Sequence, residues 1–72
     1  MNAKQGNHKP LQEISGSYYE GFGWGITEIV KFIEAAGIFT MLLTTRKVVH
    51  FTPENAERFR RWLKYHNITD IT

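Results

Sequence analysis

The side chains best suited to catalysis or metal binding are the three histidines and the glutamates. Near neutral pH a histidine can serve as an acid, a base or a metal ligand. However, His8, His50 and His66 stand far apart, without a carboxylate or second histidine at metal-ligand spacing. A working carboxylate pair needs a pocket that separates its two pKa values, and 72 residues leave little room for one. We therefore expect no enzyme activity, no catalytic residues, no metal site and no cofactor.

The composition predicts one small cytoplasmic domain. The chain has no cysteine, which excludes disulfides, cysteine-bound zinc and thiol chemistry. A chain of this size buries only about 60% of the surface that its unfolded form exposes. Aromatic residues make up 14% of it, and each ring contributes a large buried area to a compact core. No apolar run is long enough to span a membrane, and the first ten residues lack the apolar stretch of an export signal.

The cations are concentrated in residues 41–72, although the net charge is only +2. A basic surface can neutralise phosphates of a nucleic acid, which makes such binding dependent on salt. Alternatively, arginines and lysines near a helix C-terminus are simply solvated and favourable with the helix dipole, worth about 0.3–1 kcal/mol each. Both interpretations stay open. The candidate phosphate-binding residues are Arg46, Lys47, Arg58, Arg60, Arg61 and Lys64.

Residues 14–25 are rich in glycine and aromatic side chains. Four glycines within ten residues argue against a helix, so we expect a short irregular strand or a loop anchored by aromatic rings. These rings either fill the core or offer faces on which nucleic-acid bases stack. Core filling is the simpler interpretation because a small domain needs buried area. The rings concerned are Tyr18, Tyr19, Phe22 and Trp24.

Two segments have the pattern of helices. Across 26–36 the apolar residues Ile26, Ile29, Val30 and Ile33 recur at helical spacing. Gly37 suits the left-handed position just beyond a helix end.

The second predicted helix covers 53–66. Thr52 is a natural N-cap and Pro53 suits the first helical turn. Asn67 suits the left-handed position after the last turn, and Ile68 can then fold back onto Leu63.

Between these segments, 38–51 contains two β-rich runs that predict an antiparallel hairpin. The join near Thr45 and Arg46 lacks the Asn-Gly or Asp-Gly pair of a two-residue turn, so a longer loop is expected. Alternation places Phe39, Met41, Leu43, Val49 and Phe51 on one face, which suits the helices. The opposite face carries Ile38, Thr40, Leu42, Thr44, Val48 and His50. Two helices cover only one side of so small a sheet, so residues 14–24, a second copy or a partner must cover the other side unless it stays exposed.

The sequence therefore predicts a small α+β domain over 14–72, with a helix, hairpin, helix core and an N-terminal aromatic, glycine-rich arm. A flexible tail, 1–13, precedes it. We expect a non-enzymatic binding module that acts through a protein partner or self-association, with no membrane and no small-molecule substrate. The partner-binding residues on the apolar sheet face would be Ile38, Leu42, Val48 and His50.

Two alternatives remain. One is a small nucleic-acid-binding protein that uses the basic C-terminal helix and the hairpin tip. The other is an enzyme subunit whose site is completed by another chain.

Overall fold

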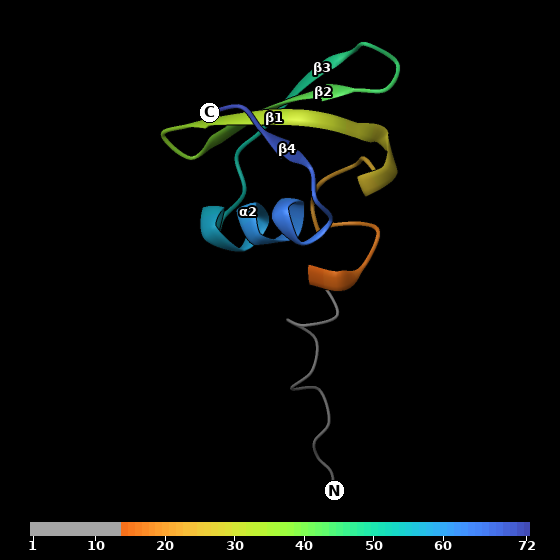
Figure 1. Ribbon diagram of the computed structural model, residues 1–72. Helices are drawn as coiled ribbons and strands as arrows, with labels where there is room; N and C mark the ends of the chain where they lie inside the picture. The colour runs from red at the N-terminus through yellow and green to blue at the C-terminus, as the bar shows by residue number, and fades with distance from the viewer. Residues whose placement is uncertain (1–13) are drawn as a thin grey trace, which may run out of the picture.

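A four-stranded mixed sheet with a ten-residue helix against it forms the described part of the chain (Figure 1). The computed structural model describes residues 14–72, and the predicted tail, 1–13, lies outside them. The strand order is β3-β2-β1-β4, antiparallel except for the parallel pair β1 and β4. The predicted α+β class is confirmed. In chain order the elements are the 3-10 turn η2 (Ile26–Glu28), β1 (Ile29–Ala35), β2 (Ile38–Leu43), β3 (Val48–Phe51), α2 (Ala56–Tyr65) and β4 (Thr69–Asp70).

The predicted first helix, 26–36, is wrong. After the short turn η2, this segment forms β1, the strand next to β2. A β-bulge explains the misleading pattern: Ile29 pairs with Leu43 and Lys31 with Leu42, so Val30 is an extra residue. The bulge sets Ile29 and Phe32, both buried, three residues apart instead of two. In sequence that spacing imitates one turn of a helix.

Two different turns connect the three antiparallel strands. Ala36 and Gly37 join β1 to β2 with φ angles of 53° and 81°, as in a two-residue primed turn. Gly37 is therefore a turn residue and not the end of a helix. Between β2 and β3 the Leu43 N–H donates to the Lys47 carbonyl, and Arg46 has a φ of 73°. This connection is longer than two residues, as predicted.

Helix α2 begins later than predicted but ends as predicted. Asn55, rather than Thr52, is the N-cap, and its side-chain oxygen accepts a hydrogen bond from the Arg58 N–H. At the other end Asn67 is left-handed, with a φ of 62°. The Ile68 N–H then donates to the Leu63 carbonyl at 3.0 Å, which is the Schellman arrangement.

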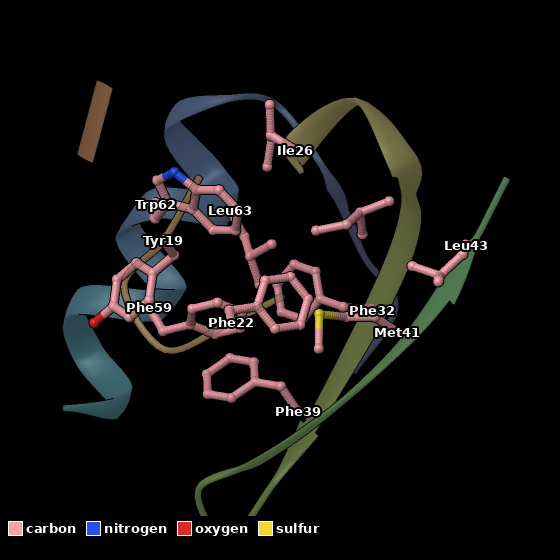
Figure 2. Close-up of a cluster of buried hydrophobic side chains, with 11 residues drawn as sticks. Tyr19, Phe22, Ile26, Phe32, Phe39, Met41, Leu43, Phe59, Trp62 and Leu63 are labelled. Carbon is pink, nitrogen blue, oxygen red and sulfur yellow. The ribbon is translucent and has the colours of Figure 1, made fainter. Parts of the chain in front are cut away.

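The core lies between α2, the inner face of the sheet and the arm over residues 14–25 (Figure 2). Phe59 is fully buried, and the rings of Phe39 and Tyr19 meet its ring edge-on at centroid distances of 4.8 and 4.9 Å. The Trp62 Nε1–H donates to the Gly16 carbonyl at 2.8 Å, which ties the arm to the helix. The buried hydrophobic residues are Tyr19, Phe22, Ile26, Ile29, Phe32, Phe39, Met41, Leu43, Phe59, Trp62 and Leu63.

Within the described part of the chain, no helix has the length and apolar character needed to cross a membrane.

Candidate interaction surface

The face of the sheet that points away from α2 is rich in apolar side chains, and we call it the outer face. Helix and arm both pack on the opposite, inner face (Figure 1). The alternation of β2 and β3 holds as predicted, with Phe39, Met41 and Leu43 buried and Ile38 and Val48 exposed. The apolar members of the outer face are Ile33, Ala35, Ile38, Leu42, Val48 and Ile71. Its polar members are Lys31, Thr40, His50 and Thr69.

The arm does not cover this surface, because its two buried rings, Tyr19 and Phe22, belong to the core on the inner side. Ile33, Ile38 and Val48 are 40%, 45% and 54% exposed, and Ile71 is also exposed. When one face of a sheet lies in solvent, the side chains that point from that face are normally polar. An apolar one is typical of a binding surface.

Two polar side chains of the outer face bind each other. Thr40 and His50 are cross-strand partners, and the Thr40 hydroxyl shares a hydrogen bond of 2.9 Å with His50 Nδ1. Burying an unpaired polar group costs free energy, whereas a bonded pair costs much less. The pair therefore allows the surrounding apolar residues to be buried by a partner without leaving these atoms unsatisfied.

Most of the basic residues on α2 face carboxylates of the same chain. Arg60 donates from Nε and Nη2 to the two carboxylate oxygens of Glu34 on β1, at 2.7 and 2.8 Å. Arg61 contacts Glu57 at 3.1 Å, one turn earlier on the helix. Because each of these arginines already pairs with a carboxylate, it attracts a phosphate less strongly than an unpaired arginine would.

Three ionisable groups, Glu34, Arg60 and Asp70, have pKa values that depart from the ordinary ones. In each case the largest cause is a hydrogen bond. The bond from Arg60 lowers the pKa of Glu34, and the same bond raises the pKa of Arg60. Hydrogen bonds from Thr72, followed by the charge of Lys64 at 3.6 Å, lower the pKa of Asp70. At neutral pH both carboxylates are therefore held ionised beside cations.

The remaining basic candidates lie elsewhere. Arg46 and Lys47 are exposed at the β2–β3 tip, and Lys47 Nζ lies 5.8 Å from the centre of the Trp24 ring. Arg58, at the start of α2, lines a surface pocket of about 340 Å³ together with Phe51 and Asn55. The six cations are therefore divided between the hairpin tip and the length of α2, from Arg58 near its start to Lys64 near its end.

The four aromatic candidates differ in how far they are exposed to solvent. Tyr19 and Phe22 are buried, so their rings are not available for stacking on a ligand. Trp24 is partly buried against the core, while Tyr18 is 67% exposed. At the end of α2, His66 Nε2–H donates to the Gly16 carbonyl oxygen of the arm at 2.9 Å. Among residues 14–72, no three His, Asp or Glu side chains are grouped so that they could hold a metal ion.

Sequence reasoning missed the part of the outer face that β1 and β4 supply. Lys31 and Ile33 were assigned to a helix, and Ile71 to no element. The Ile71 N–H donates to the Phe32 carbonyl at 2.9 Å, which places Ile71 next to β1. The β-branched Ile29, Val30 and Ile33 were the available signal, because such residues favour strands.

No protein-family model, curated protein or solved structure matches this chain.

Proposed function

We propose that this chain is a non-enzymatic binding module that docks a protein through the outer face of its sheet. The observation that carries the proposal is the contrast between the two faces. The inner face is covered by α2 and the arm, whereas Ile38, Leu42 and Val48 occupy solvent-facing positions of the outer face. If the outer face remained in water, polar side chains would be expected at these positions. The cytoplasmic location expected from the composition is part of this proposal.

The face, and not a sheet edge, is the suitable surface. The two edge strands of the described sheet are short, four residues in β3 and two in β4. Short edges flanked by a lysine or a proline, here Lys47 and Pro53, discourage the pairing of an additional strand. A partner therefore gains more from the side chains of the outer face than from backbone groups at an edge.

A photo-crosslinking amino acid placed at Val48 tests the proposal in cells of the source organism. Val48 is 54% exposed on the outer face, and Tyr65, 59% exposed on α2, is the matched control position. We expect protein adducts from position 48 and few from position 65. Equal or absent adducts at the two positions would show that the outer face is not a docking surface.

Nucleic-acid binding is the second proposal, and the exposed pair Arg46 and Lys47 at the hairpin tip favours it. It has less support because Arg60, Arg61 and Lys64 each have a carboxylate within 4 Å.

A further inference from the structure

We infer that the protein on the outer face is a second copy of this chain, packed face to face to form an isologous dimer. This inference rests on the proposed function, since it names the partner of the same surface. In such a dimer the two sheets lie about 10 Å apart with a helix on each outside, giving four layers.

The composition of the outer face favours a copy over a charged partner. Lys31 is the one formally charged side chain among its members, and it lies on β1 beside Leu42 and Thr69. A surface with so little charge has little to attract a strongly acidic or basic protein. It also does not repel its own copy. The Lys31 stem can cover apolar surface while its ammonium group stays in water.

The centre of the outer face presents few unpaired polar atoms. By register, Ile33 lies opposite Thr40, and Thr40 lies opposite His50, so these three residues form one row across the sheet. The hydrogen bond between Thr40 and His50 pairs the hydroxyl with Nδ1, and His50 Nε2 is left to bind water or a group of the partner. An isologous interface repeats every contact twice, so the benefit of this pairing is doubled there.

Residues 1–13 of the chain are a poor alternative occupant. They include only two large apolar side chains, Met1 and Leu11, which are too few to replace water over an apolar sheet face.

The available area limits the strength of the dimer. Strands about 4.8 Å apart and about 3.4 Å per residue give the outer face roughly 400 Å² at most. Two such faces bury at most about 800 Å² together, less than the roughly 1,200–2,000 Å² of stable complexes and in the range of weak, transient ones. We therefore expect a weak, rapidly reversible dimer with a dissociation constant on the order of 100 μM.

Sedimentation velocity of the full chain from about 1 to about 500 μM tests the inference, because a weak dimer replaces the monomer as the concentration rises through that range. The mass should rise from the 8.4 kDa of one chain towards twice that value. Ile33→Lys and Val48→Lys each place two charges in the interface by symmetry and should weaken the dimer at least about 100-fold. Tyr65→Lys, an equally exposed apolar site on α2, should leave it unchanged.

A second measurement guards against variants that fail to fold. The chain has no cysteine, so Val48→Cys and Tyr65→Cys each introduce one unique thiol. A short bismaleimide should join two Val48→Cys chains and leave Tyr65→Cys chains unjoined.

A wild-type chain that stays at 8.4 kDa throughout, or a dimer that both lysine variants leave intact, would overturn the inference. The adducts at position 48 then separate the two claims. Adducts with another protein would leave the proposed function standing without the dimer, and no adducts would remove both.

Discussion

Arg60 on α2 and Glu34 on β1 form a bidentate ion pair, with nitrogen–oxygen distances of 2.7 and 2.8 Å. The two residues are 26 positions apart in the chain. Their side chains are only partly exposed, 35% for Arg60 and 18% for Glu34. The fork of a guanidinium matches a carboxylate in this geometry. The pair therefore fixes the helix against the strand that sequence analysis did not recognise.

Glu34→Gln should make the folded state less stable at neutral pH. The hydrogen bond from Arg60 lowers the pKa of folded Glu34 below its ordinary value of 4.5. A lowered carboxyl pKa stabilises the folded state above the unfolded value, and this contribution is lost as the pH falls through the folded value. The difference between wild type and Glu34→Gln should therefore shrink as the pH drops below 4.5. Urea unfolding at a series of pH values measures it.

Glu57→Gln is the matched control for this prediction. Glu57 also pairs with an arginine, Arg61, but both side chains are about two-thirds exposed, at 68% and 65%. Solvent-exposed pairs of this kind contribute little to stability. We expect a smaller effect than for Glu34→Gln. An effect of Glu34→Gln that is the same at pH 3 and pH 7 would show that ionisation of Glu34 does not stabilise the fold.

Ala36→Asn should stabilise the protein by about 0.5–1 kcal/mol. Ala36 has a φ of 53° in the turn between β1 and β2, a left-handed conformation that costs an alanine roughly 1–2 kcal/mol and an asparagine less. Asparagine followed by glycine is also the preferred pair for this turn. Chemical denaturation measures the gain, and no change or a loss would contradict the turn assignment.

The glycine that follows offers the opposite test. Gly37→Ala should cost about 1 kcal/mol, because its φ of 81° is left-handed although space around it is open. Gly23 also has open space but no left-handed φ, so Gly23→Ala is the control. We expect it to be neutral or stabilising by about 0.4–1 kcal/mol. Equal losses at both glycines would show that backbone conformation is not the cause.

The same glycine shows why part of the fold could be predicted and part could not. Gly37 indicates a left-handed residue, and a helix end and a primed turn both require one. Local signals therefore located the break in the chain but not the element before it. The bulge at Val30 then gave β1 a three-residue spacing. In β2 and β3, where alternation is regular, both faces were predicted correctly from the sequence.

The candidate site divides in the same way. The alternation of a single hairpin was enough to predict which residues of β2 and β3 lie on the outer face, among them Ile38, Leu42, Val48 and His50. Ile71 joins the outer face only because β4 pairs with β1 across almost forty residues, and no local pattern predicts a strand of two residues. The partners of the basic residues were also unpredictable, since the contact between Arg60 and Glu34 depends on where α2 packs.

Phe22→Ala should destabilise the protein by about 3–5 kcal/mol, the usual cost of removing a buried ring. Phe22 is 6% exposed and packs its ring against Phe51 and Phe59, at centroid distances of 5.0 and 5.3 Å. Tyr18→Ala is the control in the same arm, because Tyr18 is 67% exposed. Its effect should stay within about 1 kcal/mol.

Chemical denaturation measures both variants. If Phe22→Ala leaves too little folded protein, Phe22→Leu provides a milder change whose loss is expected to be about 1–1.5 kcal/mol. Similar losses at Tyr18 and Phe22 would contradict the core role of the arm.

Nucleic-acid binding, where it occurs, should be weak, non-specific and strongly reduced by salt. Each phosphate contact adds about 0.9 to the slope of log affinity against log salt on duplex DNA. The double variant Arg46→Gln, Lys47→Gln should flatten this slope more than Arg61→Gln, Lys64→Gln. The reason is that Arg61 and Lys64 already have carboxylate partners at 3.1 and 3.6 Å. Fluorescence anisotropy with labelled duplexes over a salt series measures the slopes.

Arg60 must stay in both double variants. Removing Arg60 would leave Glu34 without its partner. A change in slope would then mix lost phosphate contacts with lost stability. Thermal unfolding of each variant shows whether the fold is preserved. An interface of two or three phosphate contacts cannot give tight, sequence-selective binding at physiological salt. Such binding would therefore contradict this prediction. It would place nucleic-acid binding ahead of protein docking.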